Sequence, residues 1–184
     1  MLLIDVINDM DFEGSESLVK FAEPMAARLR DFKQRARAAG VPTIYVNDNF
    51  GVWRSDFRSI VDHCVTADVP GRNVSRMLAP DDDDYFVLKP KQSAFYGTTL
   101  ETLLRSLGTR TVIITGVAGD NCVLFSANDA YLRDLDVFIP CDCVASESKE
   151  ENDHALRLMS KVVKADITPS TGLDLEALMT DEAR

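Results

Sequence analysis

The stretch TVIITGVAGDNCVLFSANDA, residues 111–130, carries the strongest structural signal in this 184-residue chain. Five β-prone residues, 111–115, lead into the turn Gly-Val-Ala-Gly at 116–119. Asp120 can then cap a helix that carries Cys122 in its first turn. The stretch therefore predicts a strand, a glycine-containing turn and a helix with a cysteine at its start.

Cys122 has the most reactive side chain in this stretch. A thiol at the start of a helix meets unpaired backbone N–H groups and the positive end of the helix dipole. Both favour the thiolate, which is the reactive form of cysteine. Cysteine is also a common small hydrophobe in protein cores. The local sequence therefore leaves two interpretations of Cys122 open, a reactive thiol and a core residue.

The composition is typical of one globular domain. The chain is 46% hydrophobic and 27% charged, and its length fits a single domain, residues 1–184, with a core of about residues 1–170 and a tail at 171–184. A net charge of −10 argues against nucleic acid or an anionic membrane as partner. No apolar run reaches the length of a membrane span, and no signal-peptide pattern is present. Four scattered cysteines then favour a reducing cytoplasm.

Strands and helices are expected to alternate along the chain. The expected strands are residues 1–6, 43–46, 85–88, 111–115, 137–140 and 166–168. The expected helices are residues 16–39, 56–65, 100–107, 120–135, 150–164 and 174–183. Pro24 is expected to kink or split the first helix. Residues 70–84 are the least regular part, and the four aspartates at 81–84 predict a solvated turn, with a cation site as the alternative.

This alternation indicates parallel βαβ units, and therefore a doubly wound α/β fold with helices on both faces of the sheet. Ligands of such sheets bind at the carboxyl ends of the strands, near the switch in strand order. Asp5 lies near the end of the first strand, Lys89 just past the third and Cys122 just past the fourth. We therefore expect these three side chains to converge at one edge of the sheet.

Together, Asp5, Lys89 and Cys122 form a complete set for acyl transfer without histidine, of which the chain has only two. A carboxylate within hydrogen-bond reach can remove the thiol proton. A nearby ammonium group favours the carboxylate and the thiolate, and backbone amides of the 116–122 turn can bind the oxyanion. Each residue also has a structural explanation: a buried ion pair, a surface lysine and a packed thiol. Their shared position at the strand ends favours a catalytic role over these structural explanations.

Three segments, in this order along the chain, resemble the isochorismatase-like cysteine hydrolases, a superfamily that includes nicotinamidases and N-carbamoylsarcosine amidohydrolase. They are LLIDVINDM at 2–10, VLKPKQSAFYGT at 87–98 and GVAGDNCVLFSANDA at 116–130. The resemblance covers essentially the whole chain and implies a doubly wound α/β fold with a six-stranded, mainly parallel sheet. It implies that Asp5 is the general base and acid, Lys89 its electrostatic partner and Cys122 the nucleophile. It also implies a cis peptide bond between Val117 and Ala118, with the amides of Ala118 and Cys122 as the oxyanion hole.

The expected function is hydrolysis of a C–N bond in a small amide or carbamoyl compound, through a thioester on Cys122. Two alternatives stay open: a non-catalytic α/β binding protein that retains the triad, and an isochorismatase-type C–O hydrolase of a vinyl ether, which does not use the cysteine. The side chains expected to contact the substrate are Met10, Asn47, Phe50, Trp53, Phe95 and Val117. For Phe50 and Trp53, packing is the alternative role. The resemblance also admits a homo-oligomer.

In several places the chain departs from the family pattern. Gly119 replaces a threonine, which is expected to loosen the turn and removes a hydroxyl. Met10 stands where an aromatic residue is frequent at the pocket. The segment NDNF at 47–50 lacks the Asp-x-His metal pattern of nicotinamidases, so we expect no metal and no cofactor. Cys141 and Cys143 lack a second pair of ligands, which disfavours zinc.

Overall fold

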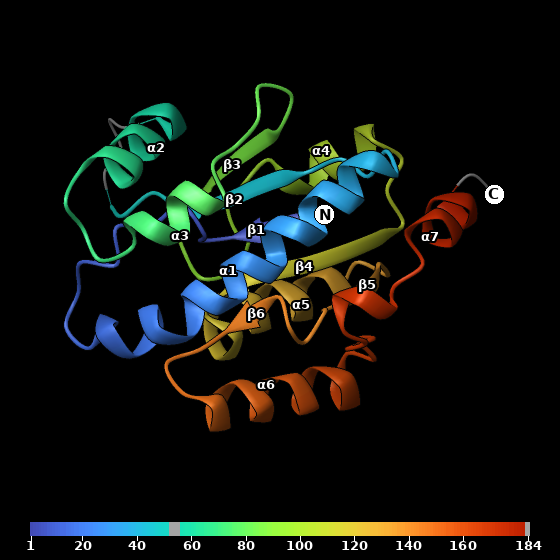
Figure 1. The fold of residues 1–184 in the computed structure, drawn as a ribbon. Helices are drawn as coiled ribbons and strands as arrows, with labels where there is room; N and C mark the ends of the chain where they lie inside the picture. The colour runs from blue at the N-terminus through green and yellow to red at the C-terminus, as the bar shows by residue number, and fades with distance from the viewer. Residues whose placement is uncertain (52–55, 183–184) are drawn as a thin grey trace.

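The computed structural model describes residues 1–51 and 56–182, which form a six-stranded sheet covered by helices (Figure 1). Five strands lie in the order β3 (Tyr85–Lys89), β2 (Ile44–Asp48), β1 (Leu2–Ile4), β4 (Thr111–Val117) and β5 (Asp136–Phe138). The sixth, β6 (Val144–Ala145), pairs with the carboxyl end of β4. The pairings between these strands are parallel. The predicted doubly wound α/β fold with a six-stranded parallel sheet is thus confirmed.

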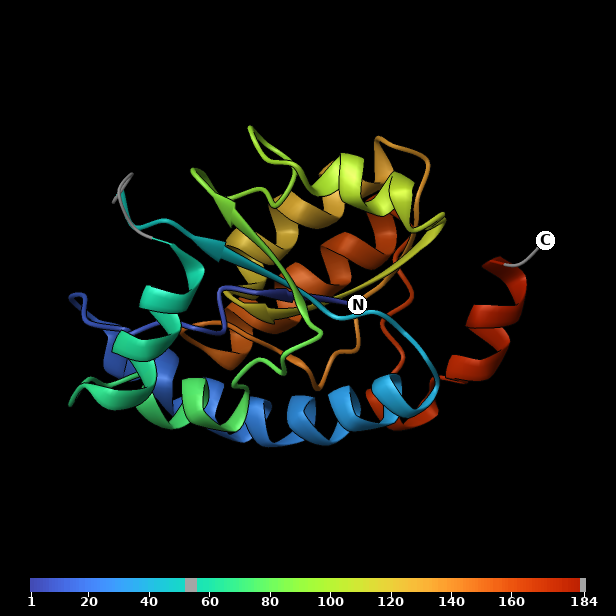
Figure 2. The same cartoon turned by 90° about the horizontal axis from the view of Figure 1, so that it is seen from above.

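Two layers of helices enclose the sheet, as the view in Figure 2 shows. One layer contains α1 (Ser15–Ala38), α2 (Phe57–Thr66) and α3 (Arg72–Met77), and the other contains α4 (Leu100–Ser106), α5 (Leu124–Tyr131) and α6 (Lys149–Val162). After the 3₁₀ turn η2 (Ser170–Gly172), α7 (Leu175–Glu182) lies beside the amino ends of β1 and β4. Within the described ranges, no helix combines the length and apolarity that a membrane span requires.

The strand β1 packs against both helical layers because its side chains alternate between the two faces of the sheet. Leu2 and Ile4 belong to the apolar cluster beneath α4, α5 and α6, whereas Leu3 belongs to the cluster beneath α1. All three side chains are fully buried, and burial of such a side chain contributes about 1.5–3 kcal/mol. Since both faces of the sheet are covered by helices, the sequence of this strand is a continuous apolar run. The residues that follow it are held firmly in place.

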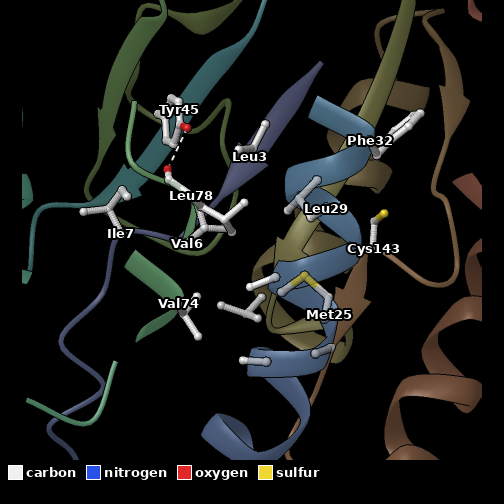
Figure 3. Packing of buried hydrophobic residues seen from close by; sticks show 14 of the residues in the cluster. Leu3, Val6, Ile7, Met25, Leu29, Phe32, Tyr45, Val74, Leu78 and Cys143 are labelled. Atoms are coloured by element: carbon white, nitrogen blue, oxygen red, sulfur yellow. Dashed lines mark hydrogen bonds between the residues drawn. The ribbon is translucent and has the colours of Figure 1, made fainter. Parts of the chain in front are cut away.

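The first helix, α1, presents one apolar face to the sheet. Its buried residues recur at steps of three and four, among them Leu18, Ala22, Met25, Leu29 and Phe32. Figure 3 shows this face of α1 turned toward the residues of β1, and it shows the Tyr45 hydroxyl donating a hydrogen bond to the Leu78 carbonyl at 2.7 Å. The helix continues through Pro24, so the proline does not split it.

The short elements differ most from the sequence-based expectation. The segment predicted to be irregular contains α3, whose residue Val74 is fully buried in the cluster beneath α1. The two-residue strand β6 was not predicted, and the strand expected at 166–168 is a single bridge between Phe138 and Asp166. These elements have too few residues to show a period, and contacts with α1 and β4 stabilise them instead.

The aspartate run at 81–84 is an exposed turn that is tied to α1 by ion pairs. Lys33 Nζ lies 2.6 Å from Asp84 Oδ2 and 3.0 Å from Asp81 Oδ2. Arg37 lies 2.9 Å from Asp81 and 2.7 Å from Asp83. The side chains of Lys33 and Asp84 are almost fully buried, whereas residues 81–83 are exposed, so the prediction of a solvated turn holds for these three and is wrong for Asp84. The alternative, a cation site, has no support among the residues of 1–51 and 56–182, where no group of three acidic, histidine or cysteine side chains can hold a metal ion.

Candidate active site

The strand order places the candidate site at a topological switch point. Neighbouring strands β1 and β4 lead to connections that run in opposite directions along the sheet, because β2 and β3 lie on one side and β5 on the other. Asp5 follows β1 directly, Lys89 is the last residue of β3, and Cys122 lies five residues after the end of β4. All three strands point the same way, so their carboxyl ends meet at one edge.

These three predicted residues do come together. Lys89 Nζ lies 2.8 Å from Asp5 Oδ2 and 3.4 Å from Cys122 Sγ. The ammonium group also donates to the carbonyl oxygen of Lys91 at 3.2 Å. Lys89 is completely buried and Asp5 is 5% exposed, whereas Cys122 is partly exposed. The lysine therefore bridges a buried carboxylate and a thiol that small molecules can reach.

Asp48 is a fourth member of this cluster that the sequence analysis missed. It is the register partner of Lys89 across β2 and β3, and its Oδ2 lies 3.7 Å from Lys89 Nζ. Its backbone N–H donates to Asp5 Oδ1 at 2.7 Å, so each oxygen of Asp5 has its own partner. The rule that singled out the other residues would have found Asp48, but the second strand was expected to end two residues earlier.

Burial shifts the proton affinities of the cluster. Burial raises the pKa of Asp5 above its ordinary value, and the opposing attraction of Lys89 does not reverse this. For Lys89, burial alone would lower the pKa, but the negative charges of Asp5 and its neighbours outweigh burial and raise it. Burial, followed by the charge of Asp5, raises the pKa of Cys122 to about 12 despite the presence of Lys89.

Lys89 favours its charged form beside a thiol whose pKa is raised. Desolvation of the thiol and repulsion by Asp5 act against the thiolate that helix geometry was expected to favour. The same burial makes Asp5 a better proton acceptor than an exposed carboxylate. Asp5 also has a left-handed backbone, with φ of 50°, a conformation that non-glycine residues adopt mainly where the surrounding fold requires it.

Cys122 lies in a π-helical turn, η1 (Gly119–Val123), rather than in the first turn of an α-helix. Ala118 occupies the N-cap position, and its carbonyl oxygen accepts hydrogen bonds from the amides of residues 121 and 123 at 3.1 Å each. No side chain caps this turn, so the prediction that Asp120 is the cap is wrong. The peptide bond between Val117 and Ala118 is cis. Single π-helical turns occur often at functional sites, and α5 continues from this turn to Tyr131, four residues short of the expected end.

The predicted substrate contacts have different environments. Met10, Phe95 and Val117 are almost fully buried in the apolar clusters, and the guanidinium group of Arg133 lies 4.8 Å from the centre of the Phe95 ring. Phe50 is 44% exposed. Trp53 lies outside the described residues. Substrate contact stays a prediction for all of them, and for the buried three the structure shows packing.

Asn47, the remaining predicted contact, is fully buried next to Asp48. Its Nδ2 donates to the carbonyl oxygen of Ile7 at 2.6 Å, and this bond ties β2 to the loop after β1. Its Oδ1 is the buried side-chain oxygen without a hydrogen-bond partner in the described part of the chain. The observed contact is structural, and substrate contact stays a prediction here too.

Two clefts lie at this edge of the sheet. One, of about 250 Å³, is lined by residues that follow β1 and β2 and by α2, including Asp9, Phe50 and His63. The other, of about 390 Å³, is lined by residues that follow β3 and by α5, including Lys91, Tyr96 and Phe125. Each cleft is wide enough for a small organic molecule, but neither is lined by Asp5, Lys89 or Cys122, so the size of the substrate stays a prediction.

The fold and the clustered side chains define an α/β protein with a buried Asp–Lys pair and a thiol at the switch point of a parallel sheet. The isochorismatase domain model matches residues 1–170, and the chain belongs to the isochorismatase family. Membership of this family makes the protein a hydrolase.

Individual relatives agree with this assignment. The chain is 44% identical over 168 residues to an uncharacterized isochorismatase family protein, YaaI, of Bacillus subtilis, covering 91% of this chain and 92% of that protein. It is 27% identical over 153 residues to an N-carbamoylsarcosine amidase of Arthrobacter, covering 77% of this chain and 57% of that one. A crystal structure of an isochorismatase family protein from Desulfovibrio vulgaris shares the fold, with a TM-score of 0.75, 23% identity and coverage of 100% and 97% of the two chains.

Proposed function

We propose that this protein is a cysteine-dependent hydrolase that cleaves a C–N bond of a small amide or carbamoyl compound. The observation that supports it best is the position of Lys89 Nζ, which contacts both the Asp5 carboxylate and the Cys122 thiol. A carboxylate as base, a cation and a thiol as nucleophile are the three groups that acyl transfer needs when no histidine takes part. The relative named N-carbamoylsarcosine amidase adds support for a C–N bond as the target.

In the proposed reaction, Asp5 removes the proton from Cys122 Sγ, and the thiolate attacks the amide carbonyl carbon. Lys89 stays protonated and stabilises the sulfur as its charge develops. The amides of Ala118 and Cys122 bind the oxyanion. The C–N bond then breaks as Asp5 returns the proton to the leaving ammonia or amine, and water, activated by Asp5, hydrolyses the thioester. Because burial raises the pKa of the Cys122 thiol, we expect the proton transfer to accompany the attack on the substrate carbonyl, which takes up the new charge.

A screen for ammonia release tests this proposal. The protein is incubated with a panel of small amides, ureides and carbamoyl compounds, and ammonia is measured with a coupled enzyme assay. We expect Cys122→Ala to lose at least about a thousandfold in kcat on any compound that reacts. Cys64→Ala is the matched control, because Cys64 is a buried thiol in α2 that contributes nothing to the cluster. Hydrolysis that survives in Cys122→Ala would disprove the cysteine mechanism.

A second function, cleavage of a vinyl ether C–O bond, has one observation in its favour. Burial raises the pKa of Asp5, so its carboxyl group retains a proton at higher pH than an exposed one and can deliver it to a vinyl carbon without help from the thiol. The same pair of variants separates the two functions. Vinyl ether hydrolysis would survive Cys122→Ala and be lost in Asp5→Asn, whereas amide hydrolysis would be lost in both.

A further inference from the structure

Gly119 directly follows Ala118 of the cis peptide bond and is the first residue of η1, the turn that carries Cys122. It lies in a space that other side chains already fill. A Cβ at this position would lie 2.5 Å from Asn152 Oδ1, 2.8 Å from Val144 Cγ1 and 3.0 Å from Ser146 Oγ. The backbone of Gly119 is not in the left-handed region, so the requirement is for space rather than for glycine conformation. The turn is therefore tightly enclosed, and the expectation that Gly119 loosens it is wrong.

The side chains that fill this space form a directed chain of hydrogen bonds. The backbone N–H of Asp120 donates to Ser146 Oγ at 3.3 Å, and Ser146 Oγ donates to Asn152 Oδ1 at 3.2 Å. Asn152 Nδ2 donates to the carbonyl oxygen of Val144 at 3.3 Å. The serine hydroxyl supplies one donor and one acceptor, as its chemistry allows. The chain thus connects the amide of Asp120 to β6.

The anchor of this chain is rigid. Ser146 is 1% exposed and follows β6 directly, and Ala145 in β6 is the register partner of Val117 in β4. Asn152 lies in the first turns of α6, a helix that begins at an N-cap formed by Ser148. The hydroxyl that contacts Asp120 is therefore held by its place directly after β6 and by the side chain of Asn152.

We propose that Ser146 and Asn152 are positioning residues for the turn that carries the nucleophile. This inference rests on the proposed function, in which the amides of Ala118 and Cys122 bind the oxyanion. Asp120 lies between these two residues, so a fixed Asp120 amide fixes the direction of both. Oxyanion stabilisation depends on donors already in place, and small displacements of such groups cost rate. Ser146 supplies the hydroxyl that position 119 lacks.

Hydrogen exchange tests the contact without a substrate. In Ser146→Ala the Asp120 amide loses its acceptor, and we expect it to exchange at least about tenfold faster than in the wild type. Ser148→Ala is the matched control. It removes the side-chain cap of α6, where Ser148 Oγ accepts from the Glu151 amide at 3.1 Å, and leaves the Asp120 contact in place. Both variants should lower Tm by a few degrees, but only Ser146→Ala should expose the Asp120 amide.

Steady-state kinetics on an amide identified by the ammonia screen test the consequence. We expect Ser146→Ala to lower kcat about tenfold with KM changed less than about twofold, because the contact matters in the transition state. Ser148→Ala should retain both parameters. Asn152→Ala removes the next link and should act in the same direction, so it serves as the second variant if Ser146→Ala does not fold.

Two results would overturn the proposal: unchanged exchange of the Asp120 amide in Ser146→Ala, or a kcat equal to that of Ser148→Ala. Failure of the proposed function would be visible separately, as a panel in which no amide releases ammonia or in which Cys122→Ala remains active. The exchange result alone would then decide whether Ser146 and Asn152 hold the turn.

Discussion

The ammonium group of Lys89 is shared by the carboxylates of Asp5 and Asp48 and by the thiol of Cys122. Burial alone would lower the pKa of Lys89, but the charges of Asp5, Cys122 and Asp48 outweigh burial and raise it. Asp48 is thus a second acidic neighbour, beside Asp5, that favours the charged form of the lysine. This arrangement explains why a lysine, rather than a histidine, can serve beside this thiol.

The pH dependence of the reaction should follow Asp5. Burial raises its pKa above the ordinary 3.8, so kcat/KM for an amide should fall on the acid side through an apparent pKa higher than that value. The pKa of Cys122 is about 12 and that of Lys89 is above 10.5, so the rate should stay level from neutral pH to about pH 10. An increase centred near pH 8.5, the value of a free thiol, would contradict a protonated resting Cys122.

Loss of Lys89 should affect stability as well as activity. Lys89→Met leaves the buried carboxylate of Asp5 without its cation, and breaking such a pair costs about 3–5 kcal/mol of unfolding free energy. In the double variant Asp5→Asn/Lys89→Met the uncompensated charge is gone, and much of the stability should return. Urea denaturation of the two single variants and the double variant measures this. Equal losses in Lys89→Met and the double variant would show that packing of the lysine stem, not charge, is the cause.

At the scale of elements, α1 and the segment before β3 are joined by charge. Lys33 of α1 lies beneath the Asp81–Asp84 turn and pairs with both of these residues, and its ammonium group also lies 5.1 Å from the centre of the Tyr45 ring. The turn precedes β3, and β3 ends in Lys89. The ion pairs on α1 thereby help to fix the strand that carries a residue of the candidate active site.

Lys33→Met should destabilise the protein because Asp84 remains buried without its cation and keeps only the hydrogen bond from the Asp81 amide. We expect a loss of about 3–5 kcal/mol in unfolding free energy by urea denaturation. Arg37→Met is the control, since the exposed guanidinium of Arg37 pairs with the same run, and it should change stability little. Similar losses in both variants would mean that surface charge rather than burial determines the effect.

The ion pairs on α1 also predict the direction of a pH effect. Burial lowers the pKa of Lys33, but its acidic partners outweigh burial and raise it, so the stabilisation is complete below the ordinary value of 10.5 and lost only as pH rises through the higher folded pKa. The hydrogen bond from Lys33 lowers the pKa of Asp81, so its contribution is present above the ordinary 3.8 and is lost as pH falls through the lower folded value. In Lys33→Met the contribution of Lys33 disappears, and that of Asp81 is reduced to its pairing with Arg37.

For the whole molecule, the order of strands determines which residues meet. Asp5, Asp48, Lys89 and Cys122 come from four segments that are far apart in sequence, and the parallel arrangement brings the ends of β1, β2, β3 and β4 to one edge. Apolar clusters on both faces of the sheet hold these strands. The candidate site is thus a property of the sheet rather than of any one segment.

Activity should not depend on a metal ion. The described residues contain no group of three acidic, histidine or cysteine side chains with metal-binding geometry. We expect an amide-hydrolysing preparation dialysed against EDTA to keep its kcat, and added zinc or manganese not to raise it. A loss of activity on dialysis that zinc restores would contradict this prediction.

An element can be predicted from the sequence when enough residues carry its pattern of apolar and turn residues. The long helix α1 and the strands β1 to β4 were predicted because apolar periodicity and turn residues are local properties. The convergence of Asp5, Lys89 and Cys122 was predictable because parallel strands end at a common edge. Short elements such as α3 and β6 could not be read from the sequence, because contacts distant in sequence stabilise them.

By itself, the sequence determined the class of fold, the family and three of the residues at the candidate site, because each depends on local pattern or on motifs. Only the tertiary structure decided the protonation of Cys122, since burial and neighbouring charges set its pKa. Tertiary structure also brought Asp48 to Lys89 and placed Ser146 and Asn152 around Gly119. The pKa of Cys122 and the space around Gly119 depend on neighbouring side chains, and residues distant in sequence supply those neighbours.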